Sequence, residues 1–216
     1  NTHTMIAPLQ PSSMPDVSLR EAVGAVFSPG GALASVSGSD FVFEARTQQV
    51  QMATSTAEAL ENGRHLIVEA GTGVGKSLAY AVPLLLFAKQ TGCRVMVSTQ
   101  TISLQEQLIG KDLPLLKAQL NLDVRAVLVK GRSNYLCRRR LGRARTHQQE
   151  LFGDGVAADL ERIRVWADTT EDGSVQEMRR QPSQDAWNAV CAEHGNCLGG
   201  QCPERKGCFL QRARAR

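Results

Sequence analysis

The sequence has no long hydrophobic run, and its charges are nearly balanced. The longest apolar run, 78–88, contains Pro83 and is too short to cross a bilayer. The first residues lack a charged region followed by an apolar one, so no secretory signal is predicted. A net charge of +4 is too small to indicate a nucleic-acid partner by itself. We therefore expect a cytoplasmic protein with no membrane partner, of one or two globular domains.

One glycine-rich stretch, 69–77, lies between an apolar β-branched run and an apolar helix. Its alternating glycines allow successive backbone N–H groups to face one centre, and the following helix N-terminus adds positive potential. In this P-loop order Lys76 reaches the β- and γ-phosphates and Ser77 ligates Mg²⁺. The first glycine of the usual pattern is replaced, and a glycine-rich turn that binds nothing is the alternative. The predicted ATP and Mg²⁺ site comprises Ala70, Gly71, Thr72, Gly73, Val74, Gly75, Lys76 and Ser77.

Around this stretch, short apolar runs alternate with helical patterns. This alternation predicts an α/β fold with a parallel sheet. The predicted helices are 19–27, 47–62 with Val50, Ala57 and Leu60 facing inward, and 76–89 with a kink at Pro83, while 111–114 interrupts a further helix. The predicted buried strands are 65–68, 94–99 and 125–130.

Two polar clusters flank these elements, and each has two interpretations. Arg46, Gln49 and Met52 share one side of a helix start, which fits either a surface stripe or adenine recognition, because Gln offers a donor and an acceptor together. The Thr- and Gln-rich segment 99–107 follows a strand, at the edge where parallel sheets bind ligands. It fits either phosphate and sugar contacts or an ordinary capped helix start.

Beyond residue 130 the chain becomes basic and then helical. Five arginines occur in 138–145, which fits phosphate binding or a solvated helix face. The polar segment 147–190 is predicted to be helical, with Leu160, Ile163 and Trp166 facing inward.

The six cysteines contain no C-x₂-C pair, the spacing that short zinc knuckles favour. Cys197, Cys202 and Cys208 follow a C-x₄-C-x₅-C pattern, and the fourth ligand of a metal centre is either Cys137 or Cys191. Closing the 59-residue loop from Cys137 costs about 4 kcal/mol, which metal binding outweighs. The absence of C-x₂-C favours a [4Fe–4S] cluster over zinc, and unrelated free cysteines are the third interpretation.

Taken together, these motifs resemble the N-terminal part of a DinG-type helicase, in the XPD-like iron–sulfur branch of superfamily 2 DNA helicases. The resemblance covers the chain from about Leu19 to its end, and in such helicases Ala at position 70 is usual. The order of the motifs carries it: RxxQxxM at 46–52, EAGTGVGKS at 69–77, STQTISLQEQ at 98–107, KDLP at 111–114, KGRSNYLC at 130–137 and the last three cysteines.

The resemblance implies a RecA-like P-loop NTPase sheet, forming part of motor domain 1, with an inserted small helical iron–sulfur domain. It implies motor segment 19–136, cluster domain 137–208 and a return to the motor at 209–216, while the prolines and serines of 1–18 predict a disordered segment before them. Arg46 and Gln49 would read the adenine. The [4Fe–4S] cluster, with zinc as alternative, would be held by Cys137, Cys197, Cys202 and Cys208. DNA contacts would come from Thr99, Gln100, Thr101, Arg132 and Tyr135.

The activity implied is that of a monomeric, ATP-dependent 5′→3′ helicase acting on single-stranded and forked or unwound duplex DNA, in DNA repair or replication. The sequence departs from such helicases in having no Asp-Glu dipeptide, and therefore no Asp-Glu-Ala-His box. We thus expect an N-terminal fragment, without the second motor domain, that neither hydrolyses ATP at a useful rate nor unwinds DNA alone. The alternatives are a non-catalytic nucleic-acid-binding module stabilised by zinc or a cluster, and a P-loop ATPase with a zinc domain.

Overall fold

The computed structural model describes residues 17–34, 46–146 and 154–215. The chain divides into two compact units, Asn1–Ala126 and Val127–Arg216. The division falls ten residues before the predicted domain boundary after residue 136. Nearly all of the segment predicted to be disordered, 1–18, lies outside the described residues.

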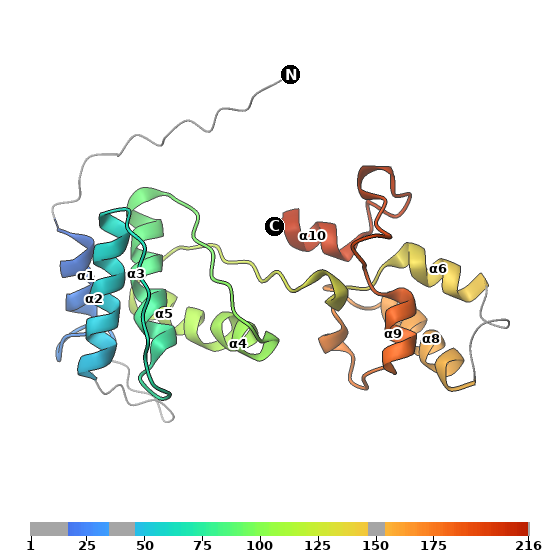
Figure 1. The fold of residues 1–216 in the computed structure, drawn as a ribbon, viewed down its shortest axis with the longest axis horizontal. Helices are drawn as coiled ribbons and strands as arrows, with labels where there is room; N and C mark the ends of the chain where they lie inside the picture. Colours follow the sequence, from blue (N-terminus) through green and yellow to red (C-terminus); the bar gives the residue numbers. More distant parts are fainter. Residues whose placement is uncertain (1–16, 35–45, 147–153, 216) are drawn as a thin grey trace, which may run out of the picture. The chain divides into compact units, whose positions relative to one another are not determined.

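The described part of the first unit is built from helices (Figure 1). Helix α2 packs against α1 and α3, and these three helices contribute most of a core centred on Val23, Ala53, Ala57 and Val82. The elements are α1 (Leu19–Val26), α2 (Thr47–Glu61), α3 (Lys76–Thr91), α4 (Ile102–Gln107), the π-helical turn η1 (Leu108–Asp112) and α5 (Leu113–Gln119).

The three helix predictions in this unit are confirmed, with small shifts at the ends. Ala57 is fully buried, and Val50 and Leu60 pack against the same core. Pro83 lies inside α3. The predicted interruption at 111–114 is a π-helical turn that continues into α5, where Pro114 occupies the first turn. Pro114 is tolerated there because the first N–H groups of a helix have no intrahelical partner.

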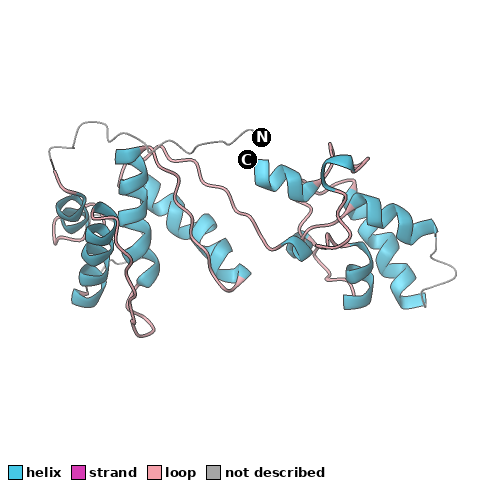
Figure 2. Ribbon diagram, turned by 45° about the horizontal axis from the view of Figure 1, so that its top comes forward, coloured by secondary structure: helices cyan, strands magenta, loops and turns pink. Residues whose placement is uncertain are grey.

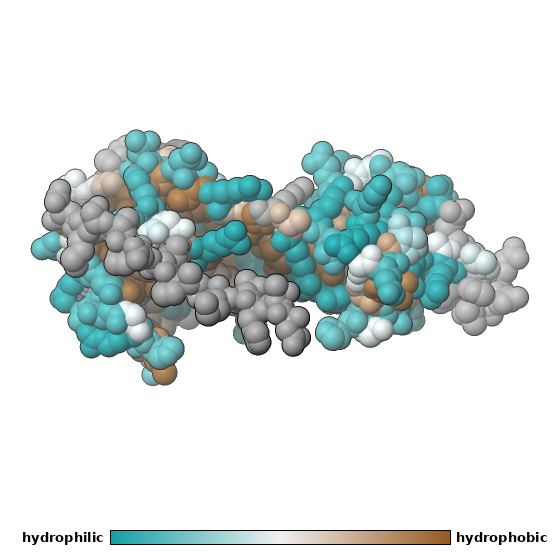
Figure 3. Space-filling model, turned by 90° about the horizontal axis from the view of Figure 1, so that it is seen from above, coloured by the Kyte–Doolittle hydropathy of each residue, from teal (hydrophilic) through white to brown (hydrophobic). Residues whose placement is uncertain are grey.

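The three predicted strands are wrong as strands of a sheet in this structure. The segments 65–68, 94–99 and 125–130 are not helical, and the described residues contain no strand (Figure 2). Ile67 and Met96 are 97% and 90% exposed. A strand needs a neighbouring strand for its ladder of hydrogen bonds, and strands that follow each other in sequence need not be neighbours in a sheet. Figure 3 shows hydrophobic residues among polar ones on the face that it presents.

The second unit is a small helical domain. Its helices are α6 (Arg138–Thr146), α8 (Asp154–Ala167), α9 (Gln184–Val190) and α10 (Phe209–Ala215), with the 3₁₀ turns η2 (Arg132–Asn134), η3 (Val175–Glu177) and η4 (Gly199–Gln201). Leu160 and Ile163 are buried as predicted, and Trp166 is half-buried with its ring edge-on to Trp187, 6.4 Å between centroids. Within the described ranges, no helix has the length and apolar character needed to span a membrane.

Candidate functional site

The glycine-rich loop adopts a backbone that its glycines make possible. Gly73 and Gly75 have φ values of +80° and +82°, in the left-handed region that other residues rarely adopt. Gly75 is also the N-cap of α3, so the loop leads directly into a helix N-terminus. A Cβ atom on Gly75 would lie 2.1 Å from Nε2 of Gln49, so the close approach of this side chain also requires glycine.

Lys76 and Ser77 begin α3, as the P-loop pattern requires. The Lys76 ammonium donates to the carbonyl oxygens of Ala70 at 3.0 Å and Gly71 at 2.6 Å. The side chain therefore bends back over its own loop. An ammonium group has three donors, so one N–H remains for a phosphate oxygen while these two bonds are kept.

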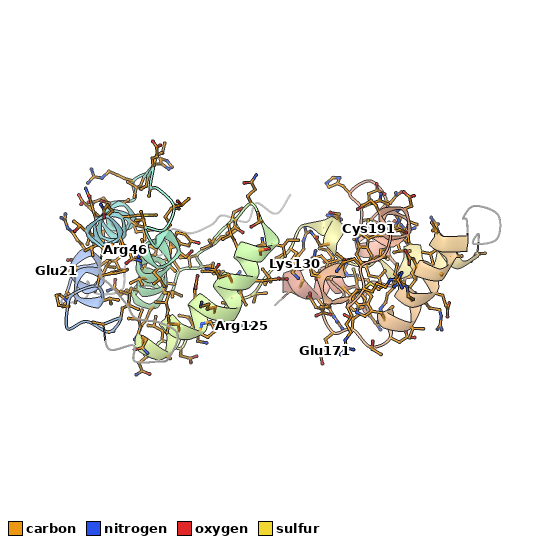
Figure 4. All side chains as sticks on the ribbon, turned by 90° about the horizontal axis from the view of Figure 1, so that it is seen from below. Glu21, Arg46, Arg125, Lys130, Glu171 and Cys191 are labelled. Carbon is orange, nitrogen blue, oxygen red and sulfur yellow. The ribbon has the colours of Figure 1, made fainter. Side chains whose placement is uncertain are left out.

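The predicted adenine-reading residues meet the P-loop. Arg46 donates to the carbonyl oxygen of Gly73, and Nε2 of Gln49 donates to that of Gly75 at 3.0 Å (Arg46 is labelled in Figure 4). Gln49 is only 3% exposed, and its Oε1 is buried without a hydrogen-bond partner. Burial excludes the surface-stripe interpretation for Gln49. Adenine recognition stays a prediction, and the free Oε1 is an acceptor of the type it needs.

The segment 99–101 forms a capped helix start. The Thr101 hydroxyl accepts from the Leu104 N–H at 3.3 Å and so caps α4, while the Thr99 hydroxyl donates to the Thr101 carbonyl at 3.1 Å. Gln100 is exposed. The geometry thus agrees with the ordinary capped-helix interpretation, and the DNA contacts stay a prediction.

In the second unit, four cysteines line one small, open cavity. Three arginines, Arg139, Arg140 and Arg205, share the lining. The fifth cysteine of the unit, Cys191, is absent from the lining and is buried at the end of α9 (labelled in Figure 4). The cysteines of the cavity are the four that the resemblance selected: Cys137, Cys197, Cys202 and Cys208.

The surroundings of Cys197 and Cys191 shift the two thiols in opposite directions. The backbone N–H of Gly199, together with the Arg132 and Arg139 side chains, lowers the pKa of Cys197. Burial raises the pKa of Cys191 above its usual range. Because the thiolate is the form that binds metals, these environments suit Cys197 as a ligand and disfavour Cys191.

The arginine run fits neither of its predicted interpretations at its first three positions, because these side chains bond to the protein itself. Arg138 donates to the Ala167 carbonyl at 3.0 Å, and Arg139 donates to the Asn196 carbonyl. Arg140 donates to three acceptors: the Cys191 carbonyl (2.9 Å), the Asn188 carbonyl (2.7 Å) and the Glu193 carboxylate (2.9 Å). Sequence reasoning missed this role, and the position of the run directly after Cys137 was the available signal.

The two remaining predicted DNA contacts lie in different surroundings. Arg132 is half-buried and close to Cys197. Tyr135 is fully buried in the core, and its hydroxyl accepts from the Lys130 N–H at 3.0 Å. A ring enclosed in this way cannot stack on a base, so we leave Tyr135 out of the proposed DNA contacts.

Comparison with known proteins places these features in a family. Residues 49–152 match the DEAD/DEAH box helicase family. The chain is 39% identical over 194 residues to the ATP-dependent DNA helicase YoaA of Escherichia coli (strain K12), which covers 87% of this chain and 28% of YoaA. It is 40% identical over 187 residues to the ATP-dependent helicase DinG of Mycobacterium tuberculosis (strain ATCC 25618 / H37Rv), covering 78% and 28%.

A further relative is the 3′-5′ exonuclease DinG of Bacillus subtilis (strain 168), 34% identical over 136 residues, which are 63% of this chain and 14% of that protein. The chain thus spans little more than a quarter of the length of the YoaA and DinG helicases it matches. The P-loop segment, the paired Arg46 and Gln49 contacts and these similarities lead to one conclusion: the chain carries a DEAD/DEAH box helicase domain and is a homologue of the DinG and YoaA ATP-dependent helicases.

Proposed function

We propose that this chain is the ATP-binding and cluster-bearing part of a DinG-type, ATP-dependent 5′→3′ DNA helicase acting in DNA repair or replication. The observation that carries the proposal is the single cavity lined by Cys137, Cys197, Cys202 and Cys208, in a chain that also holds a P-loop. Spacing predicts Cys197, Cys202 and Cys208 as ligands, and the resemblance adds Cys137 in preference to Cys191.

In the ATP site, Lys76 would bind the β- and γ-phosphates and Ser77 would ligate Mg²⁺. Arg46 and Gln49 hold the loop by its Gly73 and Gly75 carbonyls, which orients the N–H groups of the loop. The sequence contains no Asp-Glu pair to hold Mg²⁺ and orient the attacking water. We therefore propose that ATP turnover requires further segments of a longer protein.

A [4Fe–4S] cluster fits the donor set of the cavity. Among the described residues no three Cys, His, Asp or Glu side chains are grouped closely enough to hold a single ion. Tetrahedral zinc brings its thiolates within about 4 Å of one another, given Zn–S bonds of roughly 2.3 Å. A cluster of four irons separates its thiolates more widely, which suits four cysteines spread around one cavity. When bound, the cluster would supply a four-way cross-link between the segments that carry the cysteines.

DNA binding is proposed for the motor segment and the basic second unit together. The second unit has sixteen Lys and Arg against eleven Asp and Glu, whereas the first unit has nine against ten. Phosphate contacts depend on such positive charge. Thr99, Gln100, Thr101 and Arg132 are the proposed contacts, with single-stranded and forked or unwound duplex DNA as substrates of a monomeric, cytoplasmic enzyme.

The extended segments 65–68, 94–99 and 125–130 are proposed to be strands of the RecA-like sheet in the longer protein. Their exposed apolar side chains, such as Ile67 and Met96, support this proposal, because these side chains have no partner surface among the described residues. Pairing with further strands would cover them.

The metal content of the protein tests the proposal first. In anaerobically purified protein we expect a broad visible absorption band and about four irons and four sulfides per chain, the count that a [4Fe–4S] cluster requires. A colourless protein with one zinc per chain would refute the cluster and leave a P-loop ATPase with a zinc domain.

Nucleotide binding tests the P-loop separately. Lys76→Ala should weaken binding of a fluorescent ATP analogue with Mg²⁺ by at least about tenfold, because a hydrogen bond to a charged group contributes about 1.5–3 kcal/mol. Lys89→Ala, in the last turn of the same helix, is the matched control and should bind normally. Equal affinities of the two variants would contradict the assignment.

A further inference from the structure

We propose that Arg138 and Phe209 are positioning residues that fix Cys137 and Cys208 relative to each other across the cavity. This inference rests on the proposed cluster site. Arg138 follows Cys137 in the chain and Phe209 follows Cys208, so each residue sits directly beside one cysteine. The two cysteines are 71 positions apart in sequence, and a contact between their neighbours is therefore a long-range tie.

The tie is a phenylalanine ring contacted by two guanidinium groups. The Arg138 guanidinium carbon lies 4.9 Å from the centroid of the Phe209 ring, and that of Arg212 lies 5.0 Å from it. Phe209 is 1% exposed, so the ring is enclosed in the core of the unit. Cation–π contacts are strongest where water is excluded, and two cations on one ring fix its orientation.

Two glycines, Gly207 and Gly173, allow close packing against Arg138 and Phe209. A Cβ on Gly207 would lie 3.4 Å from Cδ of Arg138, so the chain just before Cys208 packs against the Arg138 side chain. A Cβ on Gly173 would lie 2.1 Å from Cγ of Phe209, and the Gly173 carbonyl accepts from the Leu136 N–H at 2.8 Å. Both neighbours of Cys208 therefore touch Arg138, and Gly173 contacts the residue before Cys137 as well as the one after Cys208.

Arg138 has one satisfied donor and one buried, unsatisfied donor. Its guanidinium donates to the carbonyl of Ala167, the last residue of α8, where the helix dipole favours a cation. Its Nε, however, is buried without a hydrogen-bond partner. A buried donor left unsatisfied is destabilising, so a purely structural role would be served better by an apolar side chain. A planar guanidinium can stack on the ring, which the compact ammonium of a lysine cannot.

The test compares metal retention and folding in four variants of the full chain: Arg138→Met, Arg138→Lys, Phe209→Leu and Arg212→Gln. Arg164→Gln, at a partly exposed arginine on α8 paired with Glu161, is the matched control. Iron and sulfide per chain, the visible band, and the rate of iron release to a chelator report the site. Far-UV circular dichroism melting of the metal-free protein reports the fold.

We expect Arg212→Gln to speed iron release about two- to fivefold, the change expected from one cation–π contact. Arg138→Met and Phe209→Leu should speed it by more than about tenfold, and Arg138→Lys, which restores the charge without the stacking, should fall between wild type and Arg138→Met. The Arg164→Gln control should match wild type.

Folded variants that release iron at the wild-type rate would overturn the positioning role while leaving the cluster site intact. If Arg138→Met does not fold, Arg212→Gln provides the test, because it removes a cation from the same Phe209 ring and its side chain is exposed. A wild-type chain that binds no iron would instead overturn the proposed cluster site, and this inference with it.

Discussion

Gly173→Ala should destabilise the second unit by about 2–5 kcal/mol. Gly173 has φ +71°, and a non-glycine residue in this left-handed region costs about 1–2 kcal/mol. The added methyl group would lie 2.1 Å from Cγ of Phe209, a distance that real Cβ atoms do not reach. Forcing extra volume into a packed core costs about 1–3 kcal/mol more. The two effects add because one is local to the backbone and the other comes from the ring.

Tryptophan fluorescence gives a selective assay for this variant. Both tryptophans of the chain, Trp166 and Trp187, lie in the second unit, so their signal during denaturant unfolding reports that unit. Gly199→Ala is the matched control: Gly199 has φ +55°, and nothing lies within 4 Å of an added Cβ. Gly199→Ala should lose only the stability that the left-handed backbone conformation costs, about 1–2 kcal/mol.

The difference in stability loss between Gly173→Ala and Gly199→Ala tests the packing argument. If Gly173→Ala loses no more stability than Gly199→Ala, the Phe209 ring is not held against Gly173, and the packing argument is wrong. A loss about 1–3 kcal/mol larger, the overpacking range, would support it.

Three further predictions concern a cap, a carboxylate and the P-loop. Ser18→Ala should cost α1 about 1 kcal/mol by removing its capping box, seen as faster amide exchange in α1 with α3 as internal reference. The Ser183 N–H and then Arg162 lower the pKa of Asp159 from 3.8 to about 2. The ionised carboxylate therefore contributes its full stabilisation of the folded state above about pH 4, and this contribution is lost as the pH falls towards 2. In Asp159→Asn, the free energy of unfolding should depend less on pH over that window. Gln49→Ala should weaken binding of the fluorescent nucleotide about three- to tenfold, since it removes the bond to the Gly75 carbonyl; unchanged affinity would show that this bond does not order the loop.

Structural features that depend only on residues close together in the sequence were predictable. The Gly-rich loop before α3 and the periodicity of α2 depend on neighbouring residues, and both were confirmed in the structure. Spacing identified three of the four cysteines that line the cavity. The order of the motifs, through the family resemblance, identified the fourth, Cys137. Spacing makes Cys137 the candidate and Cys191 its competitor, and the fold separates the two, because Cys137 lines the cavity whereas Cys191 is buried outside it.

Features that depend on distant partners were not predictable. The carbonyl acceptors of Arg138 and Arg139 lie 29 and 57 residues away along the chain, so a run of arginines looked like a free basic face. Tyr135 carries a polar hydroxyl, but the fold encloses its ring and turns that hydroxyl towards the Lys130 backbone. The segments 65–68 and 94–99 have strand-like composition, yet composition cannot supply the neighbouring strands that a sheet requires.

The cavity draws its walls from both ends of the second unit, and this sets an order of events during protein synthesis. Cys137 leaves the ribosome some 70 residues before Cys208, at a stage when α10 has not been made. Because nascent chains are produced at about 5–20 residues per second, Cys137 waits roughly 4–14 seconds for its last cavity partner. During that interval its thiol is open to oxidation. The proposed cluster could therefore be completed only after Cys208 has been translated, late in the synthesis of the helical unit.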